Sequence, residues 1–200
     1  TEHGTVKKTP LTAFSRPRAT GIIAVDLRDD DQLVDVQLTD GDRDIMLFAT
    51  SGKAIRFKES DVRPMGRTAA GVRGIRLAEG QRVIALIIVG EGEILTATEH
   101  GYGKRTPIDD YPIQGRGGQG VIAIQTSERN GDLVGALQVD EGREMVLISN
   151  SGTLVRTPIA EVSVLSRNTQ GVRLIRLDSG DQLCGLDVLQ SEDDVEDVDD

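Results

Sequence analysis

Lysine and arginine side chains, which bind phosphate groups well, recur in four short stretches of the 200-residue sequence. The stretches are residues 4–20, 52–70, 101–119 and 152–170, and together they hold 14 bases against 5 acids. The rest of the chain holds 9 bases against 28 acids, so the net charge of −10 conceals a segregation of charge. Recurring cations in an acidic chain are typical of a surface that holds a polyanion by its phosphates. The bases expected to contact it are Lys7, Lys8, Arg16, Arg18, Lys53, Arg56, Arg63, Arg67, Lys104, Arg105, Arg116, Arg156 and Arg167.

Residue types that carry catalysis or hold metals are sparse. His3 and His100 both precede a glycine at the same place in a repeated pattern, which indicates a turn residue better than a general base. The single cysteine, Cys184, cannot form an internal disulfide or a zinc cluster. The glycine-rich segment 115–120 lacks the Lys-Ser/Thr ending of a phosphate-binding loop. We therefore expect no catalytic residue, no metal and no cofactor within this chain.

The cationic stretches are set by an internal repeat of about 50 residues. Each repeat contains a first glycine that opens a basic segment and a second glycine that opens an apolar one. The first glycines are Gly4, Gly52, Gly101 and Gly152, and the second glycines are Gly21, Gly71, Gly120 and Gly171. A regular period of this length is typical of stacked or radial repeats, none of which buries a core alone.

Each period is patterned as strands. Its apolar segments are short and rich in β-branched residues, with Asp-Gly or Ser-Gly turns between them. The expected strands include 22–27, 33–38, 45–50, 53–57, 83–89, 94–98, 133–139 and 145–149. Four strands per period predict an all-β, propeller-like array of about four blades, incomplete at its front, over residues 1–190.

The last ten residues, 191–200, hold seven acids and no base. This composition predicts a disordered acidic tail. Two interpretations stay open: a merely solvating terminus, or a mobile anion that competes with a polyanionic ligand for the basic stretches.

Several strings of residues are distinctive beyond their spacing. They are Arg56-Phe-Lys-Glu-Ser, Gly71-Val-Arg-Gly-Ile-Arg-Leu, Gly101-Tyr-Gly-Lys-Arg-Thr and Arg167-Asn-Thr-Gln-Gly-Val. With the acidic end, they make the whole chain resemble the C-terminal domain of the A subunit of bacterial DNA gyrase. The resemblance implies a β-pinwheel, a propeller-like disc whose four-stranded blades exchange strands between neighbours. About six blades form the full domain, of which this chain supplies the last four.

The resemblance also implies a function. The domain is non-catalytic and wraps double-stranded DNA around a basic perimeter without sequence preference, so that the ATP-dependent holoenzyme introduces negative supercoils. Its partners are the rest of the A subunit, which carries the catalytic tyrosine, and the ATPase subunit, in an A2B2 complex. ATP and Mg²⁺ are used elsewhere in that complex, and the location is the bacterial cytoplasm, with no membrane association.

One segment is similar to a family motif but departs from it. The family carries a Gln-Arg-Arg-Gly-Gly-Lys-Gly box in its first blade, whereas the similar segment here keeps one of its three bases and sits in a later blade. That segment is Gln114, Gly115, Arg116, Gly117, Gly118, Gln119 and Gly120. Its glycines allow backbone N–H groups to approach phosphates, and a flexible loop between blades is an equally good interpretation.

Two alternatives to DNA binding remain. The cations can form a solvated rim, or the array can be a peptide- or protein-binding propeller that works through its acidic faces. Only five residues are aromatic, which argues against base stacking in a single-strand binder. Affinity for duplex DNA as a function of salt concentration discriminates between these functions.

Overall fold

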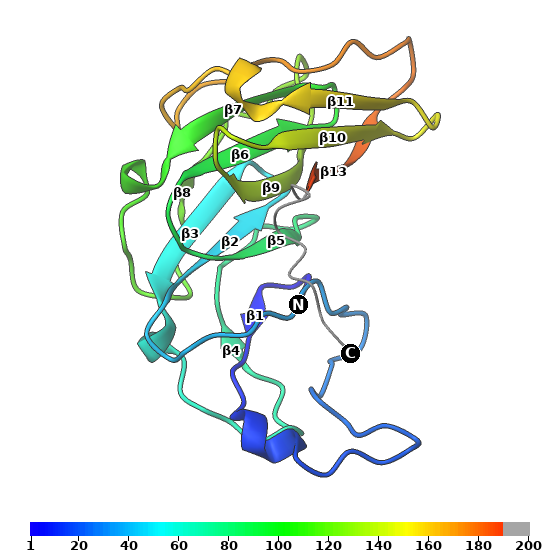
Figure 1. The fold of residues 1–200 in the computed structure, drawn as a ribbon. Helices are drawn as coiled ribbons and strands as arrows, with labels where there is room; N and C mark the ends of the chain where they lie inside the picture. The colour runs from blue at the N-terminus through cyan, green and yellow to red at the C-terminus, as the bar shows by residue number, and fades with distance from the viewer. Residues whose placement is uncertain (190–200) are drawn as a thin grey trace, which may run out of the picture. The chain divides into compact units, whose positions relative to one another are not determined.

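Thirteen β-strands and four 3₁₀ turns make up residues 1–189, the part of the chain that the computed structural model describes (Figure 1). The strands are β1 Thr5–Val6, β2 Asp44–Ala49, β3 Lys53–Lys58, β4 Val72–Arg73, β5 Val83–Ile88, β6 Glu93–Thr98, β7 Tyr102–Pro107, β8 Val121–Ile122, β9 Leu133–Val139, β10 Glu144–Ser149, β11 Leu154–Pro158, β12 Val172–Arg173 and β13 Leu183–Leu189. The turns are η1 Leu11–Phe14, η2 Glu59–Asp61, η3 Ile108–Asp110 and η4 Ile159–Glu161. The predicted acidic tail, 191–200, lies outside the described residues.

The chain divides into two compact units. Unit 1 comprises Thr1–Val89 and Pro112–Val121 and contains the pair β1-β4 and the sheet β5-β2-β3-β8. The antiparallel hairpin β2–β3 places Met46 opposite Arg56. The core of unit 1 lies around the β2–β3 hairpin and includes the buried side chains Leu47, Ile55 and Phe57. This hairpin is built as the β-branched runs and the Ser-Gly turn predict.

Unit 2 comprises Gly90–Tyr111 and Ile122–Asp200, and its described residues contain the sheets β12-β7-β6-β9 and β11-β10-β13. The hairpins β6–β7 and β10–β11 are antiparallel and have the same register as β2–β3, with Leu95 opposite Arg105 and Val146 opposite Arg156. Buried Leu95, Met145 and Leu147 belong to the core of this unit. The recurring register confirms that the 50-residue sequence repeat is also a structural repeat.

Each short strand that follows a second glycine joins the sheet of the preceding repeat. β4 pairs with β1, β8 lies beside β3, and β12 pairs with β7. Glycine is required at these crossings. A Cβ atom on Gly120 would lie 2.2 Å from the Ala54 carbonyl oxygen, and one on Gly171 would lie 2.5 Å from the Gly103 carbonyl oxygen. Both residues also have positive φ. The predicted exchange of strands between neighbouring blades is therefore confirmed.

Two predicted strands are wrong. Residues 22–27 and 33–38 have no assigned secondary structure and leave Ile23, Leu33 and Leu38 exposed. In the later repeats, the outer strands β5, β9 and β13 pair with the earlier hairpin strands β2, β6 and β10. Residues 33–38 occupy the equivalent place in their own repeat, but no hairpin strand within residues 1–189 pairs with them. Their apolar pattern is that of a strand, but the described chain offers them no ladder partner.

Each of the three hairpins, and also β1, is followed by a feature that sequence analysis did not predict, a 3₁₀ turn. Pro10, Pro107 and Pro158 cap three of the four turns, with φ between −55° and −60°. Proline is preorganised for this φ and lacks the N–H that would continue the ladder. Within residues 1–189, no helix is long and apolar enough to cross a membrane. The fold is all-β, with two four-stranded blades, one three-stranded sheet and one two-stranded pair.

Candidate nucleic-acid interface

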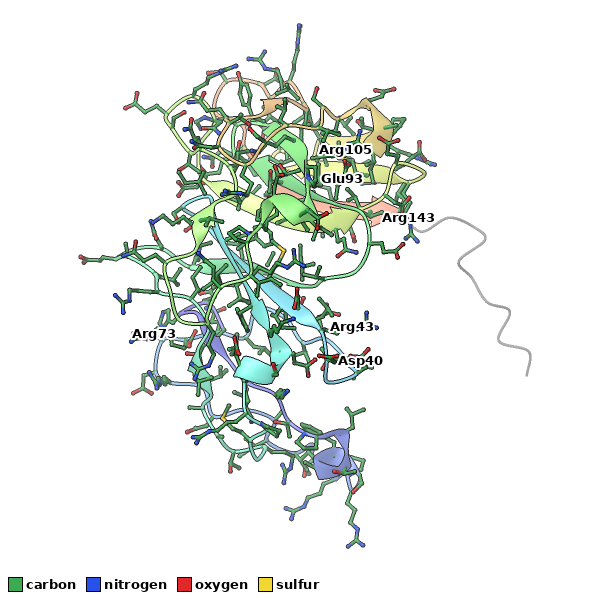
Figure 2. The ribbon with its side chains drawn as sticks, turned by 90° about the vertical axis from the view of Figure 1, so that its left-hand side faces the viewer. Asp40, Arg43, Arg73, Glu93, Arg105 and Arg143 are labelled. Atoms are coloured by element: carbon green, nitrogen blue, oxygen red, sulfur yellow. The ribbon has the colours of Figure 1, made fainter. Side chains whose placement is uncertain are left out.

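The base four residues after each first glycine forms an ion pair in all four repeats. We call these residues the hairpin cations. Arg56 Nη2 lies 2.8 Å from Asp44 Oδ2, and Lys8 Nζ lies 3.5 Å from Glu59 Oε1. In unit 2, Arg105 Nη1 lies 2.8 Å from Oε2 of Glu93 (Figure 2). The same Nη1 lies 2.9 Å from Glu141 Oε1. Arg156 Nε donates to Glu144 Oε2 at 2.6 Å. The acidic partners Asp44, Glu93 and Glu144 each begin the neighbouring strand of the hairpin, so these cations stabilise the blades.

The arginine fifteen residues after the first glycine, which we call the loop arginine, binds backbone carbonyls of the preceding repeat. Arg67 Nη1 donates to Ile23 O at 2.7 Å. Arg116 Nε donates to Asp61 O at 2.8 Å, and its Nη1 donates to Arg73 O at 3.1 Å. Arg167 Nε donates to Asp110 O at 2.5 Å, and its Nη1 donates to Ile122 O at 2.8 Å. Loop arginines therefore connect consecutive repeats.

Two lysines three residues after the first glycine strengthen this connection. Lys7 Nζ donates to Ala24 O at 2.6 Å and also to Arg67 O. Lys104 Nζ donates to Ser166 O at 2.5 Å, to Thr169 Oγ1 at 3.1 Å and also to Arg167 O. Each lysine thus binds the loop of the next repeat that carries a loop arginine. That arginine in turn binds carbonyls of the repeat to which the lysine belongs. Burial, with the charge of Arg167, lowers the pKa of Lys104 to about 8. Burial also lowers the pKa of Lys7, with a smaller contribution from Arg67.

Lys104 and Arg105 need a correction. They were expected to face the polyanion, but 0% and 3% of their surfaces are exposed. Their cationic groups bind carbonyls and carboxylates of the same unit. A cation buried in this way and bound to carbonyls and carboxylates has no access to a phosphate. The two residues are therefore part of the unit 2 framework.

Other predicted cations are exposed. Arg16, Arg18 and Arg63 are exposed, and Lys53 is half-buried. In the described part of the chain these four form no ion pair or side-chain hydrogen bond, and all lie in unit 1. Lys58 is also exposed, but its Nζ lies 3.4 Å from Asp44 Oδ1. The geometry therefore separates cations that build the blades from cations that are available to a ligand.

Sequence analysis missed four exposed arginines that follow second glycines. They are Arg73, Arg76, Arg173 and Arg176. The signal was present in the strings Gly71-Val-Arg-Gly-Ile-Arg and Gly171-Val-Arg-Leu-Ile-Arg, but the stretches chosen for charge counting ended before the second glycine. In unit 1, Arg73 and the ion pair Asp40–Arg43 point to different sides of the molecule (Figure 2). The segment that holds Asp40, just before β2, is thus separated from β4, which carries Arg73.

The glycine-rich segment 114–120 is hydrogen-bonded to the second repeat. Gln114 N donates to Arg56 O at 2.7 Å, Gly117 N donates to Gly74 O at 2.6 Å, and Gly118 O accepts from Arg76 N at 2.8 Å. Arg116 is anchored by its two carbonyl partners. These bonds favour a connecting role for the segment over a flexible loop, and Arg116 Nε and Nη1 already have protein acceptors.

Comparison with known proteins matches this architecture. A family model described as DNA gyrase C-terminal domain, beta-propeller, matches residues 1–40, 43–90, 92–140 and 143–190, which follow the four repeats. The A subunit of DNA gyrase from Pseudomonas aeruginosa is 57% identical over 191 residues, covering 95% of this chain and 21% of the relative. The corresponding protein of Salmonella typhimurium is 55% identical over 200 residues, covering 100% of this chain and 23% of the relative.

Solved structures agree with the sequence relatives. A DNA gyrase A C-terminal domain superposes with a TM-score of 0.84 at 27% identity, covering 94% of this chain and 64% of that chain. The C-terminal domain of a DNA topoisomerase IV superposes with a TM-score of 0.89 at 24% identity, covering 94% of this chain and 60% of that chain. The strand-exchanged blades define a β-pinwheel domain of the kind found in type II topoisomerases. Within that class, the chain belongs to the DNA gyrase A C-terminal domain family, and it spans under a quarter of the length of the two relatives named above.

Proposed function

We propose that this chain binds duplex DNA through its exposed arginines and lysines, without sequence preference, and bends the duplex. It acts as the non-catalytic DNA-wrapping part of an ATP-dependent gyrase in the bacterial cytoplasm. The remainder of the A subunit and the ATPase subunit, in an A2B2 complex, supply strand passage and ATP hydrolysis, so the domain itself needs no cofactor. The observation that carries the proposal is a set of cations in unit 1 that form no ion pair within residues 1–189: Arg16, Arg18 and Arg63, which are exposed, and Lys53, which is half-buried.

The chemistry of these residues supports phosphate contact. An exposed guanidinium with no carboxylate partner binds a phosphate without first breaking an ion pair. The described residues include no helix that could enter a major groove, and the aromatic residues are few. Contacts to the backbone of the duplex, with specificity set by its bendability, suit such a surface.

The experiment measures duplex-DNA affinity against salt concentration for the full 200-residue chain. We expect a linear decrease of log K with log salt, and the triple variant Arg16→Gln, Arg18→Gln, Arg63→Gln should reduce the slope by about 0.9 per lost phosphate contact. The matched control is Arg43→Gln, because Arg43 already pairs with Asp40 at 2.8 Å. Control and wild type should have the same slope.

Bending is tested separately by ligating nicked circular DNA with the chain bound. A shift in linking number that increases with bound protein supports wrapping. Affinity without any salt dependence would contradict phosphate binding and favour a peptide-binding propeller. A normal salt slope with an unchanged linking number would contradict the bending part alone.

A further inference from the structure

Tyr102 in unit 2 has two arginine side chains over its ring. The guanidinium carbon of Arg129 lies 4.9 Å from the ring centroid, and that of Arg173 lies 5.3 Å from it. Arg173 Nη2 also donates to Tyr102 Oη at 2.8 Å. The pairing of β7 with β12 sets this arrangement, since Arg173 stands directly opposite Tyr102 in the ladder. Cation–π contacts and the hydrogen bond together fix both guanidiniums on one mostly buried ring, 7% exposed.

A buried asparagine, Asn130, holds the loop that carries Arg129 in place. Asn130 is fully buried, and its Nδ2 donates to Gln125 O at 2.7 Å while its Oδ1 accepts from Ser127 N at 2.8 Å. The Arg129 side chain itself donates from Nη1 to Gln170 Oε1 at 3.3 Å. A buried asparagine with both ends of its amide engaged keeps such a loop in one conformation. Arg129 is therefore preorganised over the Tyr102 ring.

Neither arginine has an acidic partner within ion-pair distance among residues 1–189. The acids nearby in sequence have other contacts or face solvent: Glu99 Oε2 accepts from Asp132 N at 3.1 Å, and Glu128 is exposed. Two guanidiniums over one ring, with no carboxylate partner, repel each other, and an anion relieves that repulsion. The hairpin cations, each of which has a carboxylate, differ in this respect.

A cavity of about 490 Å³ in unit 2 has Arg173 of this cluster in its lining. Arg173, Arg176 and His100 line it, together with Asp178 and Asp181. The Asp181 carboxylate is engaged, because its Oδ2 accepts from Ser151 Oγ at 2.8 Å and its Oδ1 from Ser151 N at 3.2 Å. The cavity is large enough to admit a phosphate group to the face of Arg173.

We propose that Arg129 and Arg173, held on Tyr102, grip one backbone phosphate of duplex DNA. The site rests on the proposed function and adds a contact point in unit 2, where two predicted cations are buried. Guanidinium groups match the oxygens of a phosphate in a bidentate manner. The equivalent place in unit 1 is simpler, since Arg73 stands opposite Thr5 in the β1–β4 ladder and has no tyrosine beneath it.

The first test compares Arg129→Gln and Arg173→Gln with wild type in the duplex-DNA salt titration. We expect each variant to lower the slope by about 0.9 and the affinity at 0.1 M salt by about eightfold, the ratio that one phosphate contact loses between 0.1 M and 1 M. The matched control is Arg143→Gln, an arginine of unit 2 that pairs with Asp140 at 3.0 Å. It should retain the wild-type slope.

The second test needs no variant. The hydrogen bond from Arg173, and then that from Arg129, lower the pKa of Tyr102, so a phosphate that neutralises both arginines should raise it toward its ordinary value. Nuclear magnetic resonance of chain labelled at the tyrosine Cζ reports this pKa, with duplex DNA in one arm and inorganic phosphate in the other. A shift with DNA alone supports a duplex site. An equal or larger shift with inorganic phosphate alone would instead indicate a free-anion site and overturn the proposal.

The outcomes separate this site from the proposed function. If wild type does not bind duplex DNA, the proposed function fails. If wild type binds with a normal salt slope, while both variants keep that slope and the Tyr102 pKa does not move, the site fails and the proposed function stands.

Discussion

Arg105 donates from Nη1 to Oε2 of Glu93, 2.8 Å away across the β6–β7 hairpin, and both residues recur as Arg56 with Asp44 and Arg156 with Glu144. The repeated basic pattern thus serves two purposes. One set of cations ties the hairpins and neighbouring repeats together, and another set is left exposed. Substitutions of the two sets should affect different measurements.

Arg105→Gln should lower the stability of unit 2 by about 3 kcal/mol. The reason is that the substitution removes a buried arginine and leaves the Glu93 carboxylate without that partner. The equivalent exposed substitution, Arg156→Gln, should cost less than about 1 kcal/mol. Urea denaturation of the full chain measures both. Equal losses would contradict a structural role that depends on the burial of Arg105.

Lys104 should make stability depend on pH. Its pKa in the folded chain is lowered to about 8 from the ordinary 10.5, so the unfolded chain binds more protons between these values and stability from this group rises as pH increases through that window. Below about pH 8 the amine is protonated in both the folded and the unfolded chain, so this gain in stability is absent. The free-energy difference between wild type and Lys104→Met should therefore shift in favour of wild type between pH 8 and 10. A pH-independent difference would show that the amine titrates normally.

Gly103→Ala should destabilise unit 2 by about 2 kcal/mol, because the added Cβ would lie 2.2 Å from the Thr96 carbonyl oxygen and 2.4 Å from Leu174 Cδ1. Gly185→Ala is the matched control in a strand, since its Cβ would have no atom within 4 Å and should change stability by under about 0.5 kcal/mol. Thermal denaturation compares them. Similar melting temperatures would contradict the close approach of the Thr96 carbonyl and the Leu174 side chain to Gly103.

The two tyrosines should ionise at widely different pH values. Hydrogen bonds from Arg173 and Arg129 lower the pKa of Tyr102, whereas burial raises the pKa of Tyr111 far above its ordinary 10. Absorbance of the phenolate during alkaline titration should show one early step that Tyr102→Phe removes. The Tyr111 pKa is raised in the folded chain, so its contribution to stability is complete below pH 10 and decreases above it. Its step should coincide with unfolding, and one joint step near 10 would contradict both assignments.

Sequence reasoning predicted the hairpins and the repeat because glycine turns and β-branched runs act locally. It failed where a partner is distant in the sequence. Lys104 binds carbonyls 62 and 63 residues away, so nothing near Gly101 in the sequence distinguishes this buried lysine from an exposed one. The strand predicted at residues 33–38 was wrong because a strand needs a ladder partner as well as an apolar pattern.

For the candidate site, charge counting found exposed Arg16, Arg18 and Arg63 because charge segregation is visible without coordinates. It could not detect the cluster on Tyr102, because Arg129 and Arg173 reach that ring from two other parts of the chain. Their convergence depends on the β7–β12 ladder, which only the fold provides.

The borrowed strands β4, β8 and β12 have an engineering consequence. A chain that ended just after β5, at the boundary between two sequence repeats, would lack β8, the strand that closes the sheet β5-β2-β3-β8. A piece cut at such a boundary therefore carries a sheet without its last strand. Modules defined by sequence and modules defined by folding are therefore offset from each other in this protein.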